Sequence, residues 1–176
     1  MIKKQYLFVF AFAFFSCNQR KESEANTDFL YFDVKGYFAK EITHLQQLKP
    51  LVKKSVSING ATESKALVIK DWNKELAVFV DADINKTSWK GSFVASKNDS
   101  QENYTSSSKR IPVKKIVIEK QGNNIKKVEI FISNKNLLYT SNDTLTYYPD
   151  SLYLIKKQQK IRLLSSKKYS ISGKIK

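Results

Sequence analysis

The chain has 176 residues, 31 Lys and Arg against 16 Asp and Glu, and a single cysteine. This length allows one domain with one hydrophobic core. A lone cysteine excludes an internal disulfide, so packing must stabilise the fold.

The N-terminal segment carries a recognisable order of residue types. Lys3 and Lys4 precede an uncharged apolar run at 7–15, which is followed by Ser16, Cys17 and a polar stretch. The run is too short to span a bilayer, which takes roughly 20 apolar residues. A basic start, an apolar middle and a small residue before the cut are typical of a secretory signal peptide.

The ending FFSC at residues 14–17 resembles the signal of bacterial lipoproteins, in which a dedicated peptidase cuts before a cysteine that becomes acylated. It departs from the usual pattern at Phe14 and Phe15, where a leucine-like and then a small residue are typical. The resemblance covers residues 1–17 only and implies lipidation of Cys17. Acylation would also remove a free thiol that invites disulfides in an oxidising compartment.

The resemblance also implies a domain organisation and a location. Residues 1–16 would be the lipoprotein signal peptide, 17–27 a tether and 28–176 a single α+β domain. Asn18, rather than Asp, after the cysteine implies the outer membrane of the bacterial cell envelope. A secreted protein that is cut elsewhere is the alternative.

Residues 27–49 are predicted to form a helix that Thr27 or Asp28 caps and Pro50 ends. Its apolar residues fall at three- and four-residue steps and give one stripe. They are Leu30, Val34, Tyr37, Phe38, Ile42, Leu45 and Leu48.

Asn59-Gly60 predicts a hairpin between strands 53–58 and 62–69, because both residues accept positive φ. Asp71 then caps a second predicted helix at 72–84. A strand at 89–97 and a polar loop at 98–102 follow. The buried stripe of the second helix would be Trp72, Leu76, Phe79 and Val80.

The remainder predicts β structure. Alternation is clearest at 126–132 and 168–176, where one face is apolar and the other carries lysine, as in an antiparallel sheet with one wet face. Gly122-Asn123-Asn124, Asn142-Asp143 and Pro149-Asp150 are turn signals. The predicted strands are 103–108, 112–120, 125–134, 137–141, 144–148, 151–157, 160–165 and 168–175.

These elements predict an α+β fold with two N-terminal helices packed on a large antiparallel β-meander, either open or a half-closed barrel. Residues 109–176 hold 16 Lys and Arg against 4 Asp and Glu. Such a basic half can hold an anionic lipid or an acidic envelope protein, or its lysines only solvate the sheet. Nucleic acid is a poor candidate for an exported, tethered protein.

The predicted ligand or partner surface combines sheet lysines with a tyrosine cluster around Pro149-Asp150. Tyrosines at strand ends stack on sugars or line pocket mouths, although most pack within sheets. The residues of this surface are Lys127, Lys168, Lys174, Tyr147 and Tyr148.

No catalytic or cofactor motif is present, and we expect no cofactor and no metal. Asp81, Asp83 and Asn85 match the start of a calcium loop, but Lys86 and Ser92 replace its glycine and its glutamate. His44 is the only histidine, which excludes a multi-histidine metal site.

The sequence therefore indicates a lipid-anchored envelope protein that is not an enzyme and that binds a lipid, a glycolipid or an envelope partner. Binding would use the basic sheet face or an apolar pocket between helices and sheet. Two alternatives remain open. One is a subunit of an outer-membrane protein complex without a ligand pocket, and the other is an envelope hydrolase in which a carboxylate converges with His44 or a hydroxyl.

Overall fold

The computed structural model describes residues 29–176. The expected signal peptide, Cys17, the tether and the caps Thr27 and Asp28 lie outside the described residues. The helices are α1 (Val34–Leu48), α2 (Trp72–Glu75), α3 (Ala77–Val80) and the 3-10 helix η1 (Thr87–Trp89). The strands are β1 (Leu51–Ile58), β2 (Ala61–Val68), β3 (Val94–Lys97), β4 (Gln101–Thr105), β5 (Val113–Gln121), β6 (Asn124–Lys135), β7 (Tyr139–Tyr148), β8 (Leu152–Ile161) and β9 (Lys167–Ile175).

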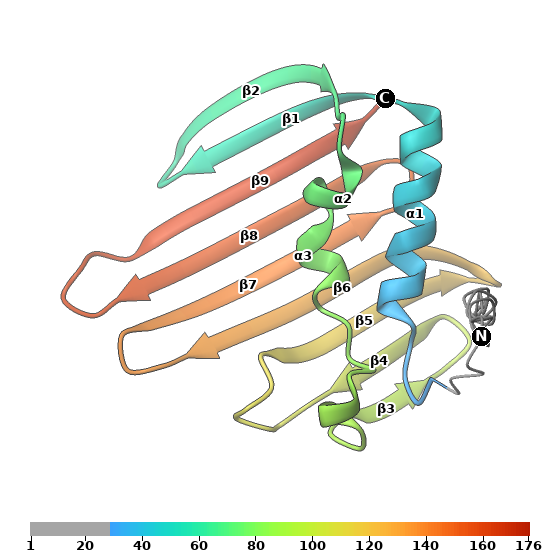
Figure 1. Ribbon diagram of the computed structural model, residues 1–176, viewed down its shortest axis with the longest axis vertical. Coiled ribbons are helices and arrows are strands. Elements are labelled where there is room, and N and C mark those ends of the chain that lie inside the picture. The colour runs from blue at the N-terminus through green and yellow to red at the C-terminus, as the bar shows by residue number, and fades with distance from the viewer. Residues whose placement is uncertain (1–28) are drawn as a thin grey trace, which may run out of the picture.

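The described strands form one antiparallel sheet in the order β2-β1-β9-β8-β7-β6-β5-β4-β3 (Figure 1). From β3 to β9 each strand pairs with the next, and the β1–β2 hairpin joins the sheet through β9. Because β2 and β3 are edges, the sheet does not close on itself. The α+β class is confirmed at this level.

The helices differ from the expected N-terminal pair. Within residues 29–176, α1 is the only helix longer than four residues, and α2 and α3 come after the first hairpin. No helix in this described part is long and apolar enough to cross a membrane.

Helix α1 begins later than its apolar pattern predicted. Asp33 caps it, since its carboxylate accepts a hydrogen bond from the Gly36 amide at 2.8 Å. Leu30 precedes the helix and is 55% exposed, so it does not belong to the buried stripe. The helix ends as predicted before Pro50, with Lys49 in the left-handed region.

The predicted helix at 72–84 is broken into α2 and α3 at Leu76, whose φ of −102° and ψ of 9° are not helical. Asp71 caps α2 as predicted and accepts from the Lys74 amide at 3.1 Å. Of the predicted buried stripe, Trp72, Leu76 and Phe79 are buried and Val80 is partly buried. The strand predicted at 89–97 shortens to β3, and the predicted loop at 98–102 runs into β4.

The turn predicted at Asn142-Asp143 is wrong, because β7 runs through it. Asn142 accepts a hydrogen bond across the sheet from the Ser133 hydroxyl at 2.8 Å, and Asp143 accepts from Ser141 at 2.5 Å. These turn-forming residues are therefore satisfied within the strand. The strand β8 ends at Ile161, so most of the strand predicted at 160–165 is wrong and forms the β8–β9 turn. The turns at Asn59-Gly60, Gly122-Asn123 and Pro149-Asp150 are present as predicted.

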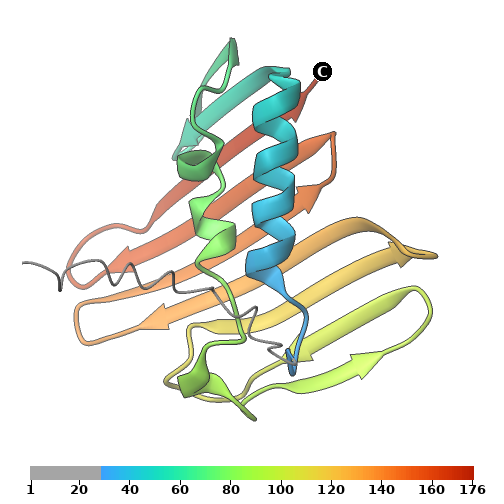
Figure 2. The ribbon, with the colours of Figure 1, turned by 45° about the vertical axis from the view of Figure 1, so that its right-hand side comes forward.

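The helices α1, α2 and α3 all lie on one face of the sheet, which we call the covered face (Figures 1 and 2). We call the opposite face the open face. Phe38 of α1 meets Tyr147 of β7 with ring centroids 5.2 Å apart, and Trp72 of α2 meets Tyr153 of β8 at 6.2 Å. Every residue of this core cluster lies between Tyr31 and Ile175.

The close approach of β8 to β9 requires Gly173. A Cβ at this position would lie 2.1 Å from the ring of Tyr153, which Trp72 holds in place. We expect Gly173→Ala to lower the free energy of unfolding by about 1–3 kcal/mol, the usual effect of overpacking. Chemical denaturation measures this value, with the neighbouring Ser172→Ala as the control. Equal midpoints for the two variants would contradict the packing described here.

Candidate binding surface on the open sheet face

Buried tyrosines bind carboxylates on the covered face. Burial, followed by the neighbouring carboxylate, raises the pKa of each phenol, so each hydroxyl stays protonated and donates. The interface between helices and sheet is thereby a packed and hydrogen-bonded layer. The pairs are Tyr147–Glu41 at 2.7 Å, Tyr153–Glu75 at 2.6 Å and Tyr104–Glu102 at 2.5 Å.

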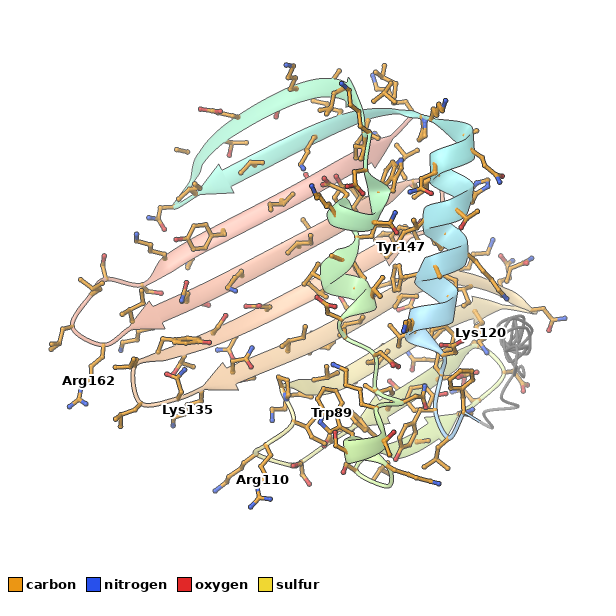
Figure 3. The ribbon with its side chains drawn as sticks, viewed as in Figure 1. Trp89, Arg110, Lys120, Lys135, Tyr147 and Arg162 are labelled. Atoms are coloured by element: carbon orange, nitrogen blue, oxygen red, sulfur yellow. The ribbon has the colours of Figure 1, made fainter. Side chains whose placement is uncertain are left out.

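Tyr147 therefore does not lie on the predicted ligand surface. It is fully buried on the covered face, where it contacts Phe38 and Phe79 and binds Glu41. Figure 3 labels it beside α1, over the part of the sheet that the helices cover. The other four predicted residues lie on the open face, as the strand register requires.

His44 and Asp150 pair across the edge of the helical layer, with Nε2 and Oδ1 3.0 Å apart. Their side chains are 52% and 61% exposed. The shallow hollow beside His44 is formed by α1 alone, from Ala39, Lys40, Thr43 and Gln47. The pair joins α1 to the β7–β8 turn, and this open setting lacks the water exclusion of a catalytic cleft.

Asn85, in the calcium-like segment, has a structural partner. Its side-chain oxygen accepts from the Tyr31 amide at 3.1 Å, and its side-chain nitrogen donates to the Phe32 carbonyl at 2.9 Å. The Asp83 carboxylate accepts from the Asn85 amide at 3.0 Å. These contacts attach the segment before α1 to the loop after α3.

The open face carries a hollow of about 440 Å³ over β1, β9, β8 and β7. We call it the lysine hollow. Most of its lining residues carry a hydroxyl, amide or ammonium group, and this mixture suits a ligand that has both negative charge and hydroxyl groups. Its lining residues on the open face are Ser57, Asn142, Thr144, Lys156, Gln158, Lys168 and Ser170, and Gly60, Lys157 and Tyr169 also border it.

The register of the strands explains why these side chains meet. One row runs across the sheet through directly paired residues, namely Ser57, Ser170, Lys156 and Thr144. The next row contains Lys168, Gln158 and Asn142. Paired side chains on one face have Cβ atoms roughly 5 Å apart, and diagonal ones about 7–8 Å apart. Lys156 and Lys168 are diagonal neighbours, so one anionic group can contact both.

The lysines of the open face differ in their partners. Lys127 lies 3.1 Å from Glu119 and 3.4 Å from Glu129. Burial alone would lower the pKa of Lys127, but these two carboxylates outweigh it and raise the pKa. Among residues 29–176, no carboxylate forms an ion pair with Lys156 or Lys168. Lys156 and Lys168 in the lysine hollow can therefore offer their positive charge to a ligand, whereas the charge of Lys127 is already neutralised by Glu119 and Glu129.

Lys174 and Tyr148 lie towards the other end of the open face. Lys174 pairs with Lys53 on β1 and with Leu152 on β8, and Leu152 in turn pairs with Tyr148. Lys168 is thus the one predicted surface residue in the hollow. Lys156 was missed because the pattern of a single strand does not show which residues lie beside it on β7 and β9.

A comparison with protein-family models, curated proteins and solved structures found no match for this chain. Its function must therefore be argued from its own residues. The lysine hollow combines ammonium groups without a carboxylate partner in the described chain with hydroxyl and amide groups, which suits a small polar ligand.

The contacts of Glu102 predict that the stability of the fold decreases at acidic pH. Burial alone would raise its pKa, but hydrogen bonds from Lys120 and Tyr104 and the charge of Lys97 lower it below 4.5. Ionised Glu102 therefore stabilises the fold above that pH, and this contribution is lost as pH falls through the lowered pKa. We expect Glu102→Gln to destabilise the protein by about 1–3 kcal/mol at neutral pH and to lose less stability on acidification.

Denaturant unfolding at neutral and acidic pH tests this expectation, with Glu63→Gln on the exposed strand β2 as the control. Equal losses of stability on acidification in the wild type and Glu102→Gln would contradict the assigned role of Glu102.

Proposed function

We propose that this protein is a lipid-anchored binding protein of the bacterial cell envelope and that the lysine hollow holds the phosphate-bearing sugar headgroup of a glycolipid. The observation that carries the proposal is the unpaired Lys156 and Lys168 among hydroxyl and amide side chains, in the described part of the open face. Ammonium groups recognise phosphate, while serine, threonine, asparagine and glutamine recognise sugar hydroxyls.

The packing of the covered face favours the open face over a lipid pocket. Between the helices and the sheet, aromatic rings from α1, α3 and β7 pack with their centroids 4.9 to 6.0 Å apart. The lysine hollow, by contrast, faces away from the helices, which leave that side of the sheet accessible. A headgroup fits this geometry better than an acyl chain.

The anchor rests on the sequence at residues 14–17. Acylation of Cys17 would hold the domain at the outer membrane, as Asn18 implies. An anchored domain meets membrane headgroups at high effective concentration, so a hollow of modest affinity is sufficient.

The lysine hollow is tested by Lys156→Gln combined with Lys168→Gln. We expect the wild type to bind deacylated lipopolysaccharide and the double variant to bind at least about tenfold more weakly, because each charged hydrogen bond contributes about 1.5–3 kcal/mol. Isothermal titration calorimetry measures both constants. The matched control is Lys53→Gln with Lys174→Gln, which removes the same charge from the other end of the open face. Absence of binding by the wild type, or equal losses in both double variants, would refute the hollow as the site.

The anchor is tested on the intact protein from a bacterial membrane. We expect a mature chain that begins at Cys17 and carries acyl chains, because the signal would be removed before that residue. Intact-mass spectrometry and labelling with a palmitate analogue measure this, and Cys17→Ala should abolish the label while Ser23→Ala keeps it. A mature chain that begins elsewhere without an acyl mass would rule out the anchor.

A further inference from the structure

Two neighbouring hairpins end in exposed leucine pairs. Leu137 and Leu138 form the β6–β7 tip and are 82% and 68% exposed. Leu163 and Leu164 lie in the β8–β9 tip and are 97% and 60% exposed. Both tips lie at the same rim of the sheet, beyond the helices (Figure 1). Leucine at a protruding tip contributes nothing to the core and exposes apolar surface to water.

The two tips are fixed relative to each other. The Arg162 amide donates to the Leu138 carbonyl at 2.8 Å, which joins one hairpin to the other. Within the first tip, the Asn136 side chain accepts from the amides of Leu138 and Tyr139 at 2.9 and 2.8 Å. The four leucines are therefore presented on one ordered edge.

Positive charge surrounds these leucines. The segments 106–112, 135–139 and 160–168 contain seven Lys and Arg and no Asp or Glu. Both arginines of the described residues, Arg110 and Arg162, lie at this rim, together with Lys135 (Figure 3). The turns at the opposite rim include Asp99 and Asp150. Acidic residues are thus present in the turns of the opposite rim and absent from these three segments.

We propose that this rim docks on an anionic lipid bilayer, with the four leucines inserted among the acyl chains and the Lys and Arg side chains at the lipid phosphates. Such a membrane is apolar inside and negatively charged at its surface. Protruding leucines flanked by basic side chains are complementary to both layers. Arginine adds bidentate contacts to phosphate.

The shape and charge of the rim favour a bilayer over a protein partner. A protein interface needs a contiguous complementary area, whereas these leucines project from two narrow tips. The lysine hollow lies beside the same rim, since Gly60 and Lys168 line it. Docking by the rim would therefore bring the hollow to the headgroup layer. This inference rests neither on the sugar headgroup nor on acylation of Cys17.

Vesicle flotation of the unacylated chain from Asn18 to Lys176 tests the inference, because this chain contains the whole described core. We expect it to float with vesicles that contain phosphatidylglycerol and to bind phosphatidylcholine vesicles more weakly. Leu163→Ser with Leu164→Ser should reduce partitioning at least about tenfold, given the transfer free energy of leucine. The control is Leu48→Ser with Leu51→Ser, exposed leucines far from the rim. Circular dichroism melting curves establish that each variant is folded.

Insertion itself is measured with an environment-sensitive dye on Leu163→Cys, whose emission should shift to shorter wavelength on phosphatidylglycerol vesicles. Arg162→Gln with Lys135→Gln should weaken binding to these vesicles only. The inference would be overturned if the wild-type protein does not bind anionic vesicles, or if the folded leucine variants bind them as tightly as the wild type does. The leucine variants keep Lys156 and Lys168, so the effect of the leucine substitutions is independent of the calorimetric test of the lysine hollow.

Discussion

One layer of helices covers one face of the sheet, and the rest of the molecule depends on this one-sided burial. On the covered face, Tyr147 and Tyr153 reach across the interface, and their hydroxyls need acceptors there. Glu41 on α1 and Glu75 on α2 supply them, so each helix is attached to the sheet by a bond as well as by apolar contact. The open face has no such layer in the described chain and remains available for polar and charged residues.

Sequence patterns predicted the parts of the fold that local chemistry decides. The Asn59-Gly60 hairpin formed as predicted, because its backbone requires positive φ. The alternation of β9 likewise placed Ile171 and Ile175 on one face and Lys174 on the other. The errors arose where tertiary partners override local preference. Asn142-Asp143 has turn chemistry, yet Ser133 on the neighbouring strand bonds Asn142 and keeps the strand extended.

The candidate site shows the same division. Alternation identified Lys168 as outward-facing, but a ligand site also requires the residues beside it on other strands. Gln158 and Asn142 become its neighbours only through the β8–β9 and β7–β8 registers, which no single-strand pattern contains. The burial of Tyr147 could not be predicted either. Tyr147 and Tyr148 are adjacent in sequence, and which of them faces the core depends on the register of the whole strand β7.

The lengths of the strands explain how the rim can differ chemically from the core. The strands β6, β7 and β8 have 12, 10 and 10 residues and so span about 30–40 Å. The helices cross them away from the rim, so the hairpin tips extend past the packed layer (Figure 2). Folding therefore places little demand on tip residues, and polar turn formers would satisfy it fully. Leucine in both tips, joined by the Arg162–Leu138 bond, creates exposed apolar surface that stability does not require. Such surface, flanked by Lys and Arg side chains in the neighbouring segments, is better explained by a membrane contact than by the fold.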